Sequence, residues 1–318
     1  MIFLDESLKA ILNSLAREPG GALHPNGQGI PLSPDRFQTI LPRQGAIGYV
    51  DGGSSELLAA SNLSLQKIRL AGVVFERTRK MTKKEEFDML IQLEGNQWKV
   101  TCFPENRFSG MQIDLYDASL REGNARVKAS KVGETVRRLA ELDFVKRFAK
   151  SVKTDVLVLD GSLEPSFTGE IFFLDALKDL PCIGLSKTSQ IITKNGLDMG
   201  SALKKEGVWW YHPVWKSDAS FGTGFVRLHA KATHVFRVDF WKNQDVTQSI
   251  SCLADQSQDP AFLGYPYGLI VADQLARIRQ EERDFLLMRL KTEAGSAWSQ
   301  IEQCVRSLNA HSVLDAIR

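Results

Sequence analysis

Two short apolar runs in this chain each end at an Asp-Gly pair. Ala46–Val50 leads into Asp51-Gly52-Gly53, and Val156–Leu159 leads into Asp160-Gly161-Ser162. An apolar run bounded by Gly and Ser predicts a buried strand that stops at a turn. A carboxylate at such a strand end is held rigidly, and Gly lets a phosphate backbone or a metal ion approach the main chain. Two such ends side by side in one sheet would form a divalent-metal site.

The hydrophobic pattern also predicts the elements around these pairs. An amphipathic helix is expected over residues 5–17, followed by a Gly/Pro-rich connector over residues 19–34. The first β region should contain strands at Gly45–Asp51 and Ser64–Glu76, and a hairpin of Met89–Gln92 with Trp98–Phe103. The later elements are expected, in chain order, as a helix over Val132–Lys150, a strand ending at Asp160, a helix at Ile171–Leu177, strands at Cys182–Leu185, Gly207–His212, Gly224–His229 and His234–Trp241, and helices at Tyr267–Arg279 and Ala297–Leu308.

This order of elements favours one fold class. A β-meander, then a helix, then alternating strands and helices are typical of an α/β fold. We therefore predict a ribonuclease H-like core with a mixed sheet, decorated by additional helices and β segments.

Composition narrows the class of protein further. With 43% hydrophobic and 25% charged residues the chain has an ordinary globular composition, and a net charge of +2 is too small to predict nucleic-acid binding by itself. The four cysteines lie far apart without a CxxC pair, which argues against zinc and fits a reducing compartment. The N-terminus lacks a basic leader pattern, and no stretch approaches about 18 apolar residues. We expect a cytoplasmic protein with no membrane association.

Asp51 and Asp160 are the strongest candidates for chemistry. Cleavage of phosphodiesters by two metals needs several carboxylates converging on cations about 3.5–4 Å apart, and magnesium or manganese prefers such oxygen ligands. Asp-Gly is also a common turn signature, so each aspartate alone has a purely structural interpretation. A third ligand should come from the helix before the strand that ends at Asp160. Glu141 and Glu134 are candidates there, on about the same helix face, although helix glutamates are usually solvated; Glu56, after the first pair, is a weaker candidate.

Three further residues are candidates for the same site. Lys187 follows a short apolar strand within Gly184–Ser189 and can neutralise a phosphate or a developing charge. Tyr265 precedes an apolar helix, where it either hydrogen-bonds a phosphate or an attacking water, or simply packs. Asp273 is an acid on that apolar helix, where it also has Arg277 as a partner at i+4.

Two segments could contact nucleic acid. Arg77–Lys84 is a compact basic run, and further basic residues, including Arg137 and Arg138, surround the central helix. The alternative for any such run is a solvated face. The aromatic segment Trp209–Trp215 could stack bases, or its rings belong to the core or to an oligomer interface.

Taken together, these segments resemble the NurA family of DNA repair nucleases. The resemblance is carried, in order along most of the chain, by GYVDGGSS at 48–55, VLDGSL at 158–163, GLSKTS at 184–189 and YPYGLIVADQLARI at 265–278. It implies a ribonuclease H-like core, a homodimer and DNA cleavage with Mn²⁺ or Mg²⁺. It also implies action in DNA end resection and repair with HerA, a hexameric DNA-translocating ATPase, as a 5′→3′ exonuclease on single- and double-stranded DNA with single-strand endonuclease activity.

The resemblance implies roles for individual residues. Asp51, Glu141 and Asp160 would be metal ligands, and Lys187 with Tyr265 would steady the phosphate. Two departures from the family pattern stand out: the first motif reads Asp-Gly-Gly-Ser rather than Asp-Gly-Ser, and the last often carries His where this chain has Asp273. The implied organisation is a single nuclease domain over 1–318, with a helix and arm at 1–44, a catalytic core at 45–280 and C-terminal helices at 281–318.

Two other functions compete with this interpretation. An actin/hexokinase-like ATPase or kinase also uses Asp-x-Gly turns, but it predicts a Gly-rich adenosine site late in the chain, where residues 260–318 contain only three glycines. A non-catalytic DNA-binding or assembly subunit would keep the fold without the chemistry. Retention of Asp51, Glu141 and Asp160 argues against that alternative.

Overall fold

The computed structural model describes residues 6, 8–10, 13, 21–23, 29–30, 32–76, 79–203, 205–212 and 220–308. Most of the helix predicted over residues 5–17 lies outside the described residues, and those of its residues that are described, 6, 8–10 and 13, are helical. Half of the 19–34 connector also lies outside the described residues. So do Arg77, at the start of the basic run, and residues 213–215 of the aromatic segment.

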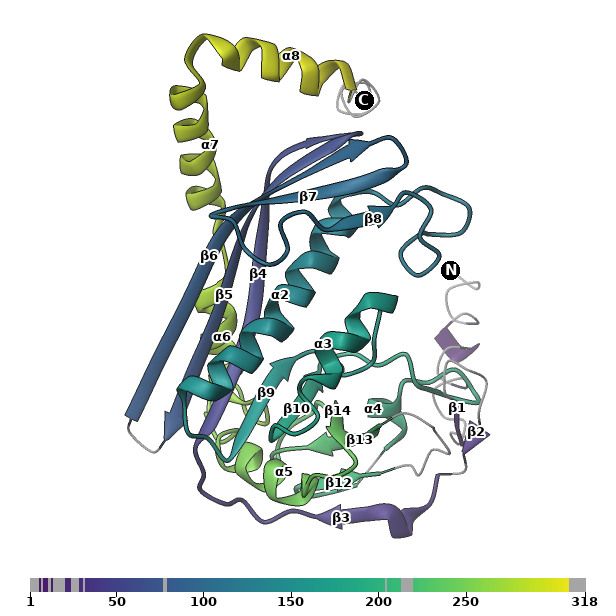
Figure 1. The fold of residues 1–318 in the computed structure, drawn as a ribbon. Helices are drawn as coiled ribbons and strands as arrows, with labels where there is room; N and C mark the ends of the chain where they lie inside the picture. Colours follow the sequence, from purple (N-terminus) through teal and green to yellow (C-terminus); the bar gives the residue numbers. More distant parts are fainter. Residues whose placement is uncertain are drawn as a thin grey trace.

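A large mixed sheet organises the part of the chain that the structure describes (Figure 1). Its eleven strands follow the order β3-β12-β13-β14-β10-β9-β4-β5-β6-β7-β8. Their bounds are β3 Phe37–Thr39, β4 Ile47–Ala60, β5 Leu63–Glu76, β6 Arg79–Glu94, β7 Gln97–Phe103, β8 Gln112–Asp114, β9 Val156–Asp160, β10 Cys182–Ser186, β12 Trp209–Tyr211, β13 Phe221–Arg227 and β14 Phe236–Trp241. A smaller sheet joins β1 Ala22–Leu23, β2 Gly29–Ile30 and β11 Ile192–Thr193.

The centre of the large sheet has the predicted ribonuclease H-like arrangement. Strands β4, β5 and β6 form an antiparallel meander, whereas β9 pairs parallel with both β4 and β10. The connection from β6 to β9 passes through β7, β8 and helix α2 Ala129–Ser151, which returns the chain in the direction that a parallel pair requires. The apolar run Val156–Leu159 is buried throughout, as expected for a parallel strand covered on both faces.

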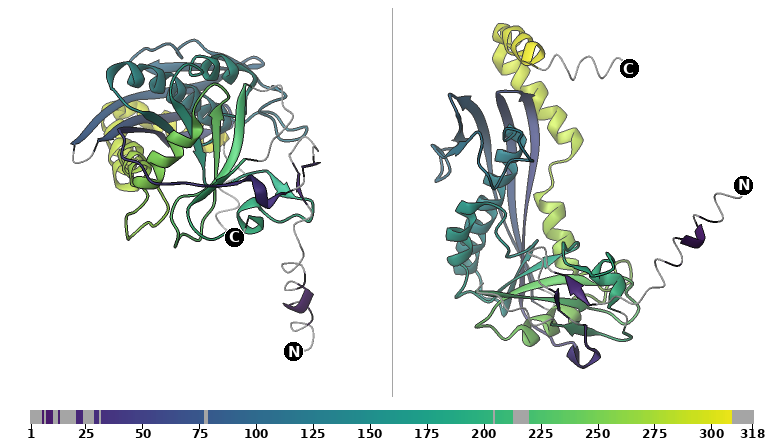
Figure 2. Two further views of the ribbon diagram at one scale, coloured as in Figure 1. Left: turned by 90° about the horizontal axis from the view of Figure 1, so that it is seen from below. Right: turned by 90° about the vertical axis from the view of Figure 1, so that its right-hand side faces the viewer.

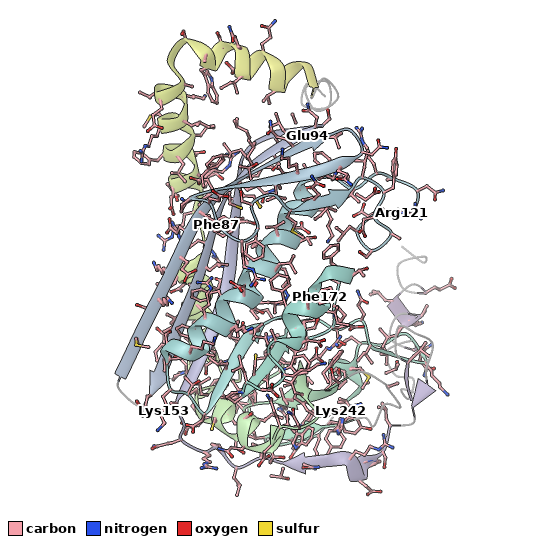
Figure 3. All side chains as sticks on the ribbon, viewed as in Figure 1. Phe87, Glu94, Arg121, Lys153, Phe172 and Lys242 are labelled. Atoms are coloured by element: carbon pink, nitrogen blue, oxygen red, sulfur yellow. The ribbon has the colours of Figure 1, made fainter. Side chains whose placement is uncertain are left out.

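Helices cover the two faces of the long strands (Figure 2). Helix α2 packs on one face through Val136, Leu139, Phe144 and other apolar residues, as its periodicity predicts. Helix α6 Tyr267–Ala276 lies on the opposite face. Side chains fill the space between α2 and the strands (Figure 3). The remaining helices and 3-10 turns are η1 Pro34–Arg36, η2 Thr168–Glu170, α3 Ile171–Asp175, α4 Met199–Ala202, α5 Val246–Asp255, α7 Gln280–Ala294, η3 Gly295–Ala297 and α8 Trp298–Leu308.

The prediction that the first strand stops at Asp51 is wrong. Strand β4 runs straight through Asp51 to Ala60 and pairs with β5 along its length, with one bulge after Glu56. The glycines after Asp51 do not form a turn. Instead, their lack of a side chain lets other parts of the protein come close to the strand. A Cβ atom added at Gly53 would lie 2.2 Å from the carbonyl oxygen of Ala276, at the end of α6. The second Asp-Gly pair is a turn as predicted, because β9 ends at Asp160 and Gly161 has φ +126°.

Several other elements extend or add to the sequence prediction. The basic residues from Arg79 onward form the first part of strand β6, and helix α5 was not predicted. Helix α7 lies in the region predicted to hold C-terminal helices, although its bounds were not predicted. Helices α7 and α8 stand at the far end of the long meander (Figure 1). Arg69 of β5 holds the start of α7 through an ion pair with Glu282 and a 2.9 Å hydrogen bond to the carbonyl oxygen of Arg277. Among the described helices, none has the length and apolar character to cross a bilayer.

Candidate functional site

The site forms where strands β4 and β9 part. Their parallel register pairs Val50 with Leu159, so the next residues, Asp51 and Asp160, lie side by side. Val50 and Leu159 pack with α2, whereas the residues before them, Tyr49 and Val158, pack with α6. Because side chains alternate along a strand, Asp51 and Asp160 both project toward the α6 side of the sheet.

Glu141 reaches these aspartates from the opposite side of the sheet. It projects from α2, is 1% exposed, and lies 3.2 Å from where a Cβ atom of Gly52 would stand. The missing side chain at Gly52 therefore opens the sheet to this carboxylate. The glycine predicted to form a turn thus has another use, which is to let acidic groups from the two faces approach each other.

Two arginines of α2 hold Glu141 in place. Arg137 Nη1 is 3.1 Å from one carboxylate oxygen, and Arg138 Nη1 is 3.4 Å from the other. Arg137 also donates a 2.6 Å hydrogen bond to the Gly52 carbonyl oxygen. Burial raises the pKa of Glu141, the two arginines oppose this, and the charge of Asp160 adds to it. Arg137 and Arg138 are among the basic residues predicted to contact nucleic acid, but their guanidinium groups are bound to Glu141.

Asp51 is the least compensated carboxylate of the three. Burial, followed by the charges of Glu141 and Asp160, raises its pKa from 3.8 to about 7. Within the described chain its hydrogen bond comes from its neighbour, the Gly52 amide, at 2.7 Å. Among the side chains that the structure describes, Glu141 and Asp160 have ion-pair partners, whereas no such partner holds the Asp51 carboxylate.

Lys187 and Tyr265 complete this cluster. Lys187 Nζ is 2.9 Å from Asp160 Oδ2 and 5.3 Å from the centre of the Tyr265 ring. Burial lowers the pKa of Lys187, but hydrogen bonds to Asp160 and Tyr265 outweigh it and raise the pKa above its usual value. Burial and the charge of Asp160 raise the pKa of Tyr265 to about 12. Both groups therefore keep their protons at neutral pH.

The other predicted site residues lie at the edge of the cluster or outside it. Asp273 on α6 pairs with Arg277 and contributes a minor share to the raised pKa of Asp51. Glu134 instead pairs with Lys131 on the outer face of α2, and Glu56 accepts a 2.6 Å hydrogen bond from Ser64. The acidic cluster therefore consists of Asp51, Glu141 and Asp160, with Asp273 at its edge.

A second group of charged residues, not predicted from the sequence, lies next to Asp160. Arg237 and Asp239 of β14 are 5% and 0% exposed and form an ion pair at 2.9 Å. Arg237 also pairs with Glu164 at 3.0 Å. The sequence contains a pattern from which this pair could have been predicted. Arg237 and Asp239 lie two residues apart on one face of an otherwise apolar strand, so they must be buried together.

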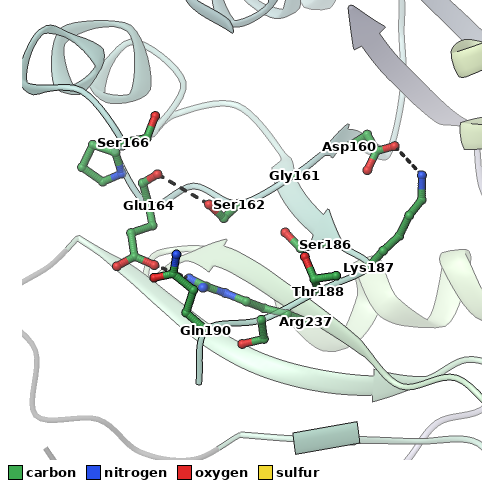
Figure 4. Close-up of a pocket in the computed structure, with 12 residues that line it drawn as sticks. Asp160, Gly161, Ser162, Glu164, Ser166, Ser186, Lys187, Thr188, Gln190 and Arg237 are labelled. Carbon is green, nitrogen blue, oxygen red and sulfur yellow. Dashed lines mark hydrogen bonds and ion pairs between the residues drawn. The ribbon is translucent and has the colours of Figure 1, made fainter. Parts of the chain in front are cut away.

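A cavity of about 680 Å³ connects this group to the cluster (Figure 4). Asp160 and Lys187 lie at one end of it, and Arg237 and Glu164 at the other. The wall between them is polar and consists mainly of residues from the loops after β9 and β10. It is formed by Gly161, Ser162, Pro165, Ser166, Ser186, Thr188, Ser189 and Gln190.

The two segments predicted to contact nucleic acid differ in how their side chains are placed. Trp209, Trp210 and Tyr211 are buried in the core, so these three rings are not available for stacking on bases. The basic residues of β6 that the structure describes are partly committed to other contacts, such as Lys80 over the Phe75 ring and Lys83 with Glu85.

The cluster also bears on metal binding. Within the described ranges, no three Asp, Glu, His or Cys side chains are placed so that they could hold one metal ion together. Glu141 is paired with Arg137 and Arg138, and Asp160 is paired with Lys187. Among the described side chains, no lysine or arginine forms an ion pair with Asp51, which accepts a hydrogen bond from the Gly52 amide. A cation would therefore have to exchange with these partners.

Comparison with known proteins identifies the fold. The chain matches no protein-family model and no curated protein sequence. It is similar to the NurA nuclease from Sulfolobus solfataricus, with a TM-score of 0.61 and 14% sequence identity over 92% of this chain and 94% of that one. A NurA bound to dAMP and manganese is similar at a TM-score of 0.49 and 8% identity, covering 78% and 88% of the two chains. The catalytic domain of human Endonuclease V is similar at a TM-score of 0.41 and 14% sequence identity, over 79% of this chain and 92% of that one.

The first of these matches confirms the resemblance to NurA at the level of the fold. It extends along nearly the whole of both chains, so the likeness is not confined to one part of the fold. At 14% identity the likeness shows the fold alone. Function has to be argued from the site.

Proposed function

We propose that this protein is a metal-dependent deoxyribonuclease that hydrolyses phosphodiester bonds. The observation that carries the proposal is the placement of Asp51 and Asp160 on adjacent parallel strands, side by side, with Glu141 reaching them across Gly52. Burial, followed by the charges of the two neighbouring carboxylates, raises the pKa of Asp51. Such an arrangement is unfavourable for the protein alone and is typical of a functional site.

The chemistry of these side chains fits a hard divalent cation. Asp51, Glu141 and Asp160 offer only oxygen ligands, which Mg²⁺ and Mn²⁺ prefer. They would hold the ion, and its charge would compensate Asp51 and compete with Lys187 at Asp160 and with the arginines at Glu141. When bound, the metal would supply Lewis-acid stabilisation of the attacked phosphate and of the leaving oxygen.

The remaining residues would act on the phosphate itself. Lys187, released from Asp160, is a charged donor for a non-bridging phosphate oxygen. Tyr265 keeps its proton and so can donate a hydrogen bond to the phosphate or orient the attacking water. Asp273 lies half-exposed on α6, where it can accept a proton at the edge of the site. Lys187, Tyr265 and Asp273 would thus act on the substrate, and Asp51, Glu141 and Asp160 would hold the metal.

The proposal extends to substrate and partners through the resemblance to NurA. We propose DNA as the substrate, 5′→3′ exonuclease and single-strand endonuclease action, a homodimer, and a HerA-type hexameric ATPase as partner in DNA end resection. The proposed nuclease domain spans residues 1–318. The exposed Phe285 and Met288 on α7 are candidates for a protein interface, since adjacent exposed apolar side chains are typical of contact surfaces.

Cleavage of end-labelled single- and double-stranded DNA with Mn²⁺, Mg²⁺ or EDTA tests the proposal. We expect metal-dependent shortening that disappears in Asp51→Ala, because this change removes a metal ligand. Asp179→Ala, at an exposed carboxylate outside the site, is the matched control and should cleave normally. Unchanged metal-dependent cleavage by Asp51→Ala would overturn the site assignment. If wild-type protein binds DNA but does not cleave it, even with the ATPase partner, the alternative of a non-catalytic DNA-binding subunit takes over.

A further inference from the structure

The cavity beside Asp160 has a second polar end that the proposed cleavage reaction does not use. Arg237, Glu164 and Gln190 gather there, away from Asp160 and Lys187 (Figure 4). The cavity volume of about 680 Å³ exceeds what a single phosphate group needs. A substrate whose phosphate lies at Lys187 would therefore extend toward this second end.

Arg237 is held rigidly at that end. Its Nε donates a 2.9 Å hydrogen bond to Asp239 Oδ1. Asp239 is itself fixed, since it accepts hydrogen bonds from the Thr223 hydroxyl at 2.7 Å and from the Leu163 amide at 3.0 Å. Burying an arginine costs free energy unless it is paired. The fold meets this cost with Asp239 and presents the guanidinium group at the cavity wall.

Glu164 occupies the cavity side of this arginine. Its Oε2 accepts a 3.0 Å hydrogen bond from Arg237 Nη2, and its side chain is 37% exposed, whereas Asp239 is fully buried. The two carboxylates therefore have different positions: Asp239 lies behind the guanidinium, and Glu164 lies where a ligand can replace it. A carboxylate and a phosphate oxygen bind arginine through the same type of charged hydrogen bond.

The wall between the two ends is lined by hydroxyl groups. Five hydroxyl groups line it, from Ser162, Ser166, Ser186, Thr188 and Ser189. No aromatic side chain lies among the lining residues, all of which the structure describes, so the cavity offers no ring on which a base could stack. Hydroxyl groups and an arginine are the donors that proteins use to bind phosphate and sugar without reading the base.

We propose that Arg237 binds the phosphate adjacent to the one that is cut, and that Glu164 occupies this anion position in the free protein. This inference rests on the proposed nuclease function and adds a second phosphate subsite to it. It makes two opposite predictions: Arg237 strengthens DNA binding, and Glu164 weakens it, because DNA binding must displace the Glu164 carboxylate from Arg237.

A scan with neutral linkages tests the subsite. Single-stranded oligonucleotides, each with one methylphosphonate linkage at a different position, are bound to Asp51→Asn protein in EDTA, and affinity is measured by fluorescence anisotropy. One linkage next to the cleavage position should weaken binding about tenfold, the loss expected for a charged hydrogen bond. Adding Arg237→Gln should abolish the effect at that linkage alone. An equal effect of this linkage with and without Arg237 would overturn the proposal.

Glu164→Gln provides a test that does not disturb the buried ion pair. It should tighten binding of the all-phosphate oligonucleotide severalfold, while Glu105→Gln, at an exposed carboxylate elsewhere, should leave it unchanged. If Glu164→Gln weakens binding or leaves it unchanged, Glu164 does not compete with DNA and the proposal fails. Cleavage by the wild type distinguishes failure of the proposed nuclease function from failure of the subsite proposal. If the wild type shows no metal-dependent cleavage, the proposed function fails. If it cleaves DNA but both binding tests are negative, only the subsite proposal fails.

Discussion

The negative charge of Asp51 should destabilise the fold when no metal is bound. Burial and the neighbouring Glu141 and Asp160 raise its pKa from 3.8 to about 7. A raised carboxyl pKa means that the folded protein binds the proton more tightly than the unfolded chain. The stabilising contribution of the protonated group is thus complete below pH 3.8 and is lost as the pH rises through about 7.

The size of the effect follows from the two pKa values. The interval between 3.8 and about 7 corresponds to roughly 4 kcal/mol, at about 1.4 kcal/mol per pH unit. Asp51 is partly accessible to solvent, which screens its neighbours, so we expect about 2 kcal/mol in practice. Asp51→Asn keeps the shape of the side chain and removes the charge. It should therefore raise the free energy of unfolding by this amount at about pH 8 and have little effect at about pH 4.

Urea unfolding in EDTA at about pH 4, 6 and 8 measures this difference. Asp179→Asn, at an exposed carboxylate, is the control and should change stability by less than about 0.5 kcal/mol at each pH. With Mn²⁺ the order should reverse, because the wild type gains binding free energy that Asp51→Asn cannot gain. A gain that is equal at low and high pH, or no gain at any pH, would refute the electrostatic reasoning.

Three further changes test other parts of the site. Lys187→Met should tighten Mn²⁺ binding about two- to fivefold, measured by calorimetry, because Asp160 loses the lysine that competes with the metal. The same change should slow cleavage, and an unchanged Mn²⁺ affinity would contradict the prediction. Tyr265→Phe should slow cleavage about tenfold by a factor that stays constant from about pH 7 to 10, since the tyrosine pKa is about 12; a factor that falls with pH would contradict it. Gly53→Ala should lower the free energy of unfolding, measured in urea, by about 1–3 kcal/mol, because the added Cβ would meet the Ala276 carbonyl oxygen. The control Ser54→Ala, at the exposed neighbouring residue, should leave this free energy unchanged.

Much of the architecture could be predicted from local pattern. The buried runs of β9 and β10, the β6–β7 hairpin and the apolar face of α2 all appear where periodicity places them. Asp160 was correctly placed at a strand end, because the apolar run and the Gly161 turn are both local features. Asp51 was misplaced, because the same local signature lies inside a strand whose continuation depends on pairing with β5.

The candidate site was predicted in part. Asp51, Glu141, Asp160, Lys187 and Tyr265 were all singled out, and the structure brings them together. Their proposed roles as ligands and phosphate donors stay predictions. The partners of these residues were not predicted, since the sequence does not show that Arg137 and Arg138 turn toward Glu141. Nor does it show that Arg237 reaches the same cavity as Lys187.

The sequence by itself determined the order of elements, the mixed α/β class and the identity of the acidic residues, because these depend on residues close together along the chain. The tertiary structure decided which charges meet. The register of β4 against β9 sets Asp51 beside Asp160, and the missing side chain of Gly52 admits Glu141 from the other face. Charge interactions depend on distance and on burial, which only the packed sheet and helices define.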